Sequence, residues 1–154
     1  GMTKKKPADN LSLLTAASVK AMQDKKARNV VSLDLRNLDR RVVDMFIICH
    51  GDSDRQVDAI AQNVAEEIRK QTGEKPWHME GTENKEWILL DYVNLVVNVF
   101  VEEKRNFYAI EELWGDAVTT KYEDEFTSPA KKTSNGRRKK ENSEGNKILI
   151  DLTF

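Results

Sequence analysis

A nucleophile and a base stand side by side at Cys49 and His50, at the end of an apolar run that predicts a β-strand. Neighbouring residues of a strand point to opposite faces of the sheet, so the thiol and the imidazole cannot meet directly. Cys49 is therefore interpreted as a buried core residue. His78 has no evident acidic partner and Ser53 has no catalytic triad, so catalysis is not predicted.

The turn at Gly51, Asp52 and Ser53 lies where the predicted strand gives way to a predicted helix. Helix N-termini attract anions, which makes a phosphate site one interpretation. However, the turn lacks the lysine and glycine spacing of a P-loop, and Asp52 and Asp54 would repel a phosphate. Ser53 and Gln56 have the spacing of a capping box, so an ordinary helix start is the preferred interpretation.

Nucleotidyltransferases have a similar Gly-Ser turn, and they bind magnesium through two carboxylates spaced one residue apart on a following strand. No such pair occurs on the predicted strands after Ser53. Asp52 and Asp54 lie in the helix entry, and Asp91 is solitary. A magnesium-dependent nucleotidyltransferase-like enzyme using these three aspartates is kept only as the alternative function. Two histidines and one cysteine are too few for an ordinary zinc site, so neither metal nor cofactor is predicted.

Charge divides the 154 residues into an acidic body and a basic tail. Residues 11–126 carry 15 Lys and Arg against 22 Asp and Glu, whereas residues 127–154 carry seven basic residues against three acidic ones. We predict a flexible N-terminal segment at 1–9, one domain at 10–126 and a disordered tail at 127–154. The terminal stretch ILIDLTF is strand-like and could pair with a sheet edge, bind a partner or lie free, of which the last is preferred.

The composition also limits the classes of partner and the cellular compartment that we expect for this protein. No apolar run is long enough for a membrane span or a signal peptide, so we expect a soluble, cytoplasmic protein without a membrane partner. The acidic body argues against nucleic acid as its main partner and favours a basic protein. Contact of the basic tail with rRNA phosphates and formation of a homodimer stay open.

The hydrophobic periodicity changes along the chain in an order typical of an α/β fold. A helix capped by Asp9 or Asn10 precedes two β-branched runs, the second of which alternates as a strand buried on both faces. A helix from Ser53 to Gly73 follows, and then a short strand and a hairpin over residues 86–100. With a last helix after the hairpin, the predicted order is αββαβββα, a small mixed β-sheet with helices packed on it.

Four separated blocks resemble, in order and spacing, the ribosomal silencing factor family, also called Iojap-like: VVSLDL, VDMFIICHGDSDRQVDAIAQNV, EGTENKEWILLDY and RNFYAIEELW. The resemblance covers residues 10–115. It implies a nucleotidyltransferase-like fold without the metal carboxylates of the enzymes, and therefore no enzyme activity. It also implies a translation repressor that binds large-subunit ribosomal protein fourteen and sterically blocks joining of the ribosomal subunits, notably during starvation.

The resemblance also implies a face of the sheet that binds the partner. On a strand, Trp87, Leu89 and Asp91 share one face, and Tyr92 is expected in or beside the turn with little room for burial. The matching Trp, and the position after the Asp, belong to the ribosome-docking surface of the silencing factors. We predict that the ribosomal protein is bound by a set of acidic and aromatic residues, namely Glu80, Trp87, Asp91, Tyr92, Tyr108 and Glu111.

The last predicted helix has one apolar stripe that includes Phe107 and Trp114. Both side chains are therefore assigned to packing, whereas Tyr108 and Glu111 are expected at the surface. Two positions in the hairpin depart from the family. Val93 replaces a glycine, which argues against a positive φ there, and Asn98 replaces a frequent histidine, which weakens any acid–base role.

Overall fold

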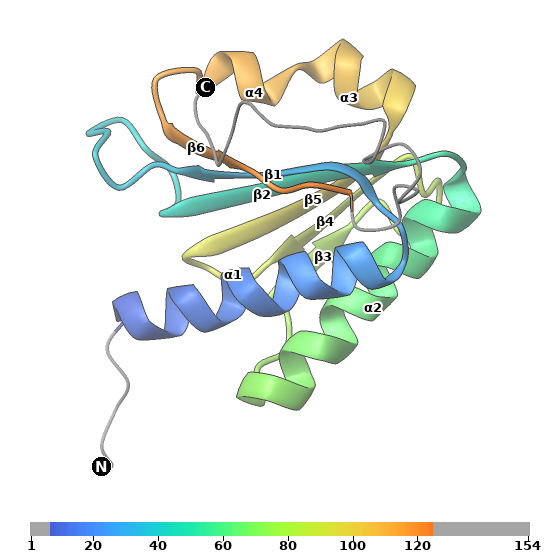
Figure 1. Cartoon of the computed structure of the whole chain (residues 1–154), viewed down its shortest axis with the longest axis horizontal. Coiled ribbons are helices and arrows are strands. Elements are labelled where there is room, and N and C mark those ends of the chain that lie inside the picture. Colours follow the sequence, from blue (N-terminus) through green and yellow to red (C-terminus); the bar gives the residue numbers. More distant parts are fainter. Residues whose placement is uncertain (1–6, 125–154) are drawn as a thin grey trace, which may run out of the picture.

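The computed structural model describes residues 7–124, which form a six-stranded sheet with helices on both faces (Figure 1). In chain order the elements are α1 (Pro7–Asp24), β1 (Arg28–Asp34), β2 (Met45–Gly51), α2 (Asp54–Thr72), β3 (His78–Glu80), β4 (Trp87–Asp91), β5 (Leu95–Val101), α3 (Glu102–Tyr108), α4 (Ile110–Leu113) and β6 (Val118–Lys121). The predicted order αββαβββα is confirmed from α1 to α3, and the structure adds α4 and β6. The predictions for residues 1–6 and 125–154, including the tail and its terminal ILIDLTF, lie outside the described residues.

The strands are arranged in the order β3-β4-β5-β2-β1-β6. β2 and β5 are parallel and the other neighbouring pairs are antiparallel, so the sheet is mixed, as predicted. A parallel pair needs a crossover connection, and the segment from α2 to β4 provides it. The helices α1 and α2 cover one face, and α3 and α4 lie on the other (Figure 1). None of the helices within residues 7–124 is long and apolar enough to cross a bilayer.

Alternation along β2 separates two apolar clusters, one on each face of the sheet. Met45, Ile47 and Cys49 point toward α1 and α2, whereas Phe46 and Ile48 point toward α3 and α4. This confirms that the strand is buried on both faces. The larger cluster is completed by the apolar stripes of the two long helices, with Leu11, Leu14, Ala17, Ala21, Met22, Val57, Ile60, Ala61, Val64 and Ile68 all buried.

The ends of α2 follow from its sequence. Ser53 is the N-cap, and its hydroxyl accepts a hydrogen bond from the Gln56 amide at 3.1 Å. The Gln56 side chain bonds back at 2.6 Å to the N–H of Asp52, one residue before the position that a capping box uses. Gly73 ends the helix with φ 81°, a conformation that favours glycine. The ordinary helix start is therefore confirmed.

The first helix begins earlier than predicted. It starts at Pro7, a residue whose fixed φ suits the first helical turn, so Asn10 lies inside the helix and is not its cap. The Asn10 amide instead donates to Glu74 Oε2 at 2.7 Å, which ties α1 to the segment just after the end of α2. The two helices are thus joined at this end by a polar contact as well as by their shared core.

The β4–β5 turn corrects a second expectation. Val93 has φ 79°, although a β-branched residue is strained in this region. Its N–H donates to Asp91 Oδ1 at 2.7 Å, and the Tyr92 N–H donates to the Leu95 carbonyl at 2.8 Å. These two bonds hold the positive φ, so the turn adopts a conformation that ordinarily favours glycine.

Candidate protein-docking face

An aromatic stack rises from the core to the surface beside β4. The Trp87 ring stacks on that of Phe100 and meets that of Tyr108 at a tilt of 45°, with centroid separations of 4.8 and 4.7 Å. Phe107 extends the stack, since its ring meets that of Tyr108 edge-on at 5.0 Å. Phe100 is buried, Trp87 is half-buried, Tyr108 is 47% exposed and Phe107 is 76% exposed. The stack therefore presents broad apolar area on rings that are already held in place.

A buried amide orients the central ring of this stack. The Trp87 indole Nε1–H donates to Asn98 Oδ1 at 3.0 Å, and Asn98 is almost fully buried. Leu89 pairs with Asn98 in the sheet, which places Trp87 diagonally beside the amide. Sequence reasoning gave Asn98 no such role, because only the register of two strands brings the pair together.

A buried arginine fixes α3 against the sheet. Arg105 is 6% exposed, and its Nε and Nη2 donate to the two carboxylate oxygens of Glu111 at 3.0 and 2.7 Å. Its Nη1 donates to His50 Nδ1 at 2.9 Å. Burial, and then the Arg105 charge, lower the pKa of His50, which favours a neutral ring whose Nδ1 accepts this bond. The network joins β2, α3 and α4, so Glu111 positions the surface helices through an internal ion pair.

The last helix is broken at Ala109, which has φ 47° and separates α3 from α4. The break interrupts the predicted apolar stripe. Trp114 is 8% exposed and packs against Phe46 with centroids 6.1 Å apart, so its assignment to the core is confirmed. Phe107 is exposed, so its assignment to the core is wrong. A uniform helical period fails wherever a residue with positive φ resets the direction of the side chains.

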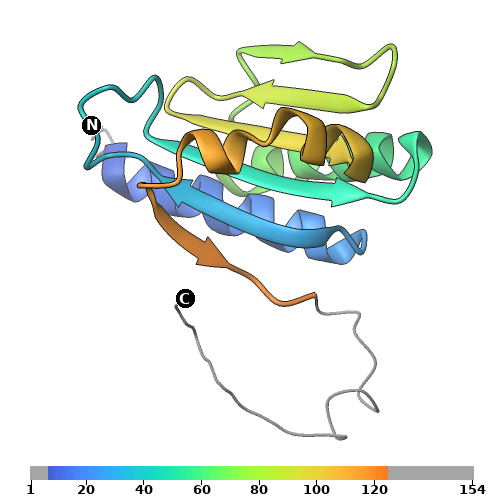
Figure 2. The ribbon, with the colours of Figure 1, turned by 90° about the horizontal axis from the view of Figure 1, so that it is seen from above.

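The strand surface beside the stack is uncovered and acidic. Glu80 pairs with Leu89 and His78 with Asp91, so both carboxylates share the sheet face of Trp87. Glu80 Oε2 lies 2.8 Å from His78 Nε2, which corrects the expectation that His78 has no acidic partner. Figure 2 shows that α3 and α4 lie over the middle strands and leave β3 and β4 open. We call this surface the docking face and define it by Glu80, Trp87, Leu89, Asp91, Phe107 and Tyr108.

Tyr92 does not belong to the docking face. It is 4% exposed and lies in the core under α1 and α2, so the expectation of little burial is wrong. The physical reason is that strand alternation continues into the turn, which sends Tyr92 to the same face as Leu90. Burial, and then the nearby Glu74 carboxylate, raise the pKa of Tyr92. Tyr92 thus supports the hairpin from inside.

The sequence pattern described as "Ribosomal silencing factor during starvation" matches residues 7–148 of this chain, beyond the 10–115 range of the resemblance. The chain belongs to the ribosomal silencing factor family. It is 40% identical to ribosomal silencing factor RsfS of Halalkalibacterium halodurans over 114 residues, which are 74% of this chain and 95% of that protein. It is 34% identical over 101 residues to the chloroplastic protein Iojap of Zea mays, covering 61% of this chain and 42% of that protein. A crystal structure of a Chromobacterium violaceum protein matches with a TM-score of 0.63 and 34% identity over 68% of this chain and 85% of that chain.

This silencing factor does not bring together the carboxylates of the alternative enzyme. Asp52 and Asp54 follow the end of β2, whereas Asp91 is aligned through β5 with Phe46 at the beginning of β2. The five steps along the strand from Phe46 to Gly51 correspond to about 17 Å, too far for one magnesium ion. Within residues 7–124, no three His, Cys, Asp or Glu side chains gather closely enough to hold a metal ion.

Cys49 and His50 point to opposite faces of β2, as the sequence predicted. Cys49 lies in the core under α1 and α2, and burial raises the pKa of its thiol to about 12. The thiol is therefore protonated at neutral pH and is a poor nucleophile. His50 faces α3 and is occupied by Arg105, so this silencing factor uses both residues for packing.

Proposed function

We propose that this silencing factor binds the large ribosomal subunit through large-subunit ribosomal protein fourteen and sterically blocks joining of the small subunit. The single observation that carries the proposal is the preorganised Trp87 ring. It is half-buried, in contact with the rings of Phe100 and Tyr108 and held by Asn98, on a strand whose α3–α4 face is largely open. Such a ring loses little conformational entropy on binding, which is what an interface anchor requires.

The docking face combines two features of a protein interface. Trp87, Tyr108 and Phe107 supply aromatic area of the kind enriched at binding hot spots. Glu80 and Asp91 supply negative charge at the edge of the same surface. Acidic groups around an apolar centre suit a basic ribosomal protein, since complementary charge speeds encounter and disfavours wrong partners.

The two remaining predicted residues act indirectly in this proposal. Glu111 holds Arg105 and thereby places α3, which carries Phe107 and Tyr108. Tyr92 braces the hairpin from the core, so we exclude it from the contact set. Blocking by bulk needs only a stable complex, and a turnover step has no part in it. We place this activity in the cytoplasm, where ribosomes join.

Sedimentation with separated ribosomal subunits tests the binding step. We expect the chain to sediment with the large subunit and not with the small one. Trp87→Ala and Tyr108→Ala should each weaken this binding by about 2 kcal/mol, roughly 30-fold, if the rings are hot spots. Leu13→Ala is the matched control, because Leu13 is exposed on α1 at the other face of the sheet.

The same experiment separates the competing interpretations. Equal binding to both subunits at low salt that disappears at moderate salt would indicate nonspecific contact of the basic tail with rRNA, against the proposal. Unchanged large-subunit binding by both alanine variants would show that another surface docks. Sedimentation of the chain alone reports whether it forms a homodimer.

A further inference from the structure

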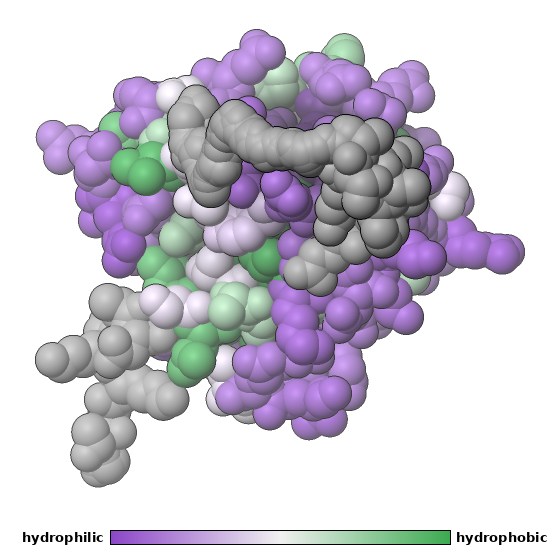
Figure 3. All heavy atoms as spheres, viewed as in Figure 1, coloured by the Kyte–Doolittle hydropathy of each residue, from purple (hydrophilic) through white to green (hydrophobic). Residues whose placement is uncertain are grey.

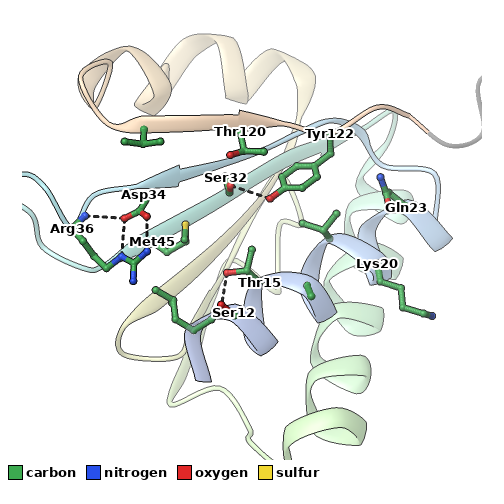
Figure 4. A pocket seen from close by; sticks show the side chains of 14 residues that line it. Ser12, Thr15, Lys20, Gln23, Ser32, Asp34, Arg36, Met45, Thr120 and Tyr122 are labelled. Carbon is green, nitrogen blue, oxygen red and sulfur yellow. Dashed lines mark hydrogen bonds and ion pairs between the residues drawn. The ribbon is translucent and has the colours of Figure 1, made fainter. Parts of the chain in front are cut away.

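A groove of about 500 Å³ lies between α1 and the edge of the sheet formed by β1 and β6 (Figure 4). It is on the α1–α2 face and at the opposite edge from β3 and β4, so it is separate from the docking face. Figure 3 shows that apolar and pale side chains gather in the middle of this face of the molecule, bordered by hydrophilic ones. The apolar part of the lining comes from Leu11, Ala16, Val19, Met45, Val118 and Tyr122.

The groove is open because α1 presents small side chains to it. Ser12, Thr15, Ala16 and Val19 follow helical spacing along the lining, and Ser12 and Ala16 are exposed. All four residues of β6 are exposed, and β6 has no strand on its outer side within residues 7–124. An apolar groove beside an open strand edge is the arrangement that accepts an added strand.

The charged groups that line the groove are already engaged. Arg36 donates to Asp34 at 2.7 Å, and Lys20 bonds Asp24 at 3.0 Å. Ser32 Oγ and the Tyr122 hydroxyl lie 3.2 Å apart (Figure 4). The groove therefore suits an apolar segment that brings its own backbone hydrogen bonds, better than a small charged ligand.

We propose that residues 148–154 of this same chain, ILIDLTF, bind in this groove as a strand added to the outer edge of β6. In an extended strand Ile148, Ile150, Leu152 and Phe154 share one face, and Leu149, Asp151 and Thr153 share the other. The first set would enter the groove beside α1. A segment with four large apolar side chains at every second position matches an apolar groove next to a sheet edge.

The position at which the described chain ends supports this occupant. Gln23 Nε2 donates to the Glu123 carbonyl at 3.0 Å, and the Asn29 N–H donates to Asp124 Oδ1 at 3.1 Å. The chain therefore leaves β6 next to the end of α1 that borders the groove. Twenty-four positions separate Asp124 from Ile148. A coil of that length spans about 27 Å on average, and the groove runs about 17 Å along α1, so the segment can reach it.

Charge favours the same arrangement. Residues 127–154 carry seven basic residues against three acidic ones, whereas residues 11–126 carry 15 against 22. The connection to the segment is thus attracted to the body of its own chain, and tethering raises the effective concentration of the segment at the groove. The proposal does not depend on ribosome binding, because the groove and the docking face lie on different faces and edges.

Cysteine trapping in the full chain tests the location. Cys49 is buried with its pKa raised to about 12, so it will not compete with introduced thiols. The variant Ala16→Cys with Leu152→Cys should form an intramolecular disulfide roughly tenfold faster than the control Gln62→Cys with Leu152→Cys, in which Gln62 is exposed on α2 outside the groove. Equal rates would overturn the proposal. Disulfides between two chains would also overturn it, because they would identify a second copy as the occupant.

Hydrogen exchange in the full chain tests the pairing with β6. Ile150→Asp with Leu152→Asp should speed amide exchange at Val118–Lys121, whereas Leu149→Asp with Thr153→Asp should leave it unchanged. Unchanged exchange in the first variant, or the same change in both, would contradict the proposal. Both variants should still sediment with the large subunit, so this result is distinguishable from a failure of the proposed ribosome binding.

Discussion

The two faces of the sheet are built in different ways. Under α1 and α2, long amphipathic helices bury a continuous apolar cluster that runs from Leu11 to Val99. Under α3 and α4 the apolar cluster is small, and polar contacts of Arg105 and Asn98 hold the aromatic side chains in place. The first face is closed by its helices, whereas the second leaves β3 and β4 open. Stability comes mainly from the first face, and the second is available for a partner.

On the second face, the largest predicted effect is the difference in stability between alanine variants of Trp114 and Phe107. Trp114→Ala should lower the free energy of unfolding by about 3–5 kcal/mol, because a ring that is 8% exposed would leave a cavity. Phe107→Ala should change it by less than about 0.5 kcal/mol, because this ring is exposed. Urea denaturation of both variants measures the difference. Similar losses would mean that α3 packs more tightly than the contacts of Phe107 indicate.

Removal of the buried guanidinium should have the next largest effect. Arg105→Met should lower the free energy of unfolding by about 2–3 kcal/mol, because Glu111 and His50 lose a charged hydrogen-bond partner. Arg69→Met is the control, since Arg69 is exposed on α2 and should change stability by less than about 0.5 kcal/mol. A stable Arg105→Met variant would show that apolar packing alone holds α3.

A smaller change in stability is expected when one buried hydroxyl under the first face is removed. The Tyr92 hydroxyl is buried and has no hydrogen-bond partner among the described residues. Tyr92→Phe should therefore raise the free energy of unfolding by about 1 kcal/mol, since an unsatisfied polar group is removed. Thermal and urea unfolding would detect the change. A clear loss of stability would show that the hydroxyl makes a contact in solution.

The smallest predicted effect is a dependence on pH. The pKa of His50 is below its ordinary value near 6.5 in the folded chain, so the unfolded chain binds the proton more readily. The contribution of neutral His50 to stability is complete above pH 6.5 and is lost as the pH falls through the lower folded pKa. His50→Gln should therefore reduce the change in the free energy of unfolding between pH 7 and pH 5. His78→Gln, at an exposed site, should retain it.

Local signals predicted much of the fold. The caps of α2 at Ser53 and Gly73 and the two-sided burial of β2 depend on residues close in sequence, so the sequence was sufficient. The position of Asn98 beside Trp87 depends on strand register, and the contact of Arg105 with His50 joins residues far apart in the chain.

Positive φ values account for two further differences. Ala109 breaks the last helix without a glycine to signal it, which exposes Phe107. Val93 likewise adopts a positive φ, supported by a contact of the Asp91 side chain. Neither residue type favours that conformation, so composition and periodicity could not predict these two positive φ values. The docking face could be predicted as a strand surface but not as an aromatic stack.

The most direct test of the proposed function is the joining of purified ribosomal subunits in the presence of this chain, followed by density-gradient separation. We expect the unaltered chain and Leu13→Ala to keep the subunits apart. Trp87→Ala combined with Tyr108→Ala should allow joining while its unfolding transition shows that it remains folded. If this folded double variant still keeps the subunits apart, the docking face is not the surface that silences the ribosome.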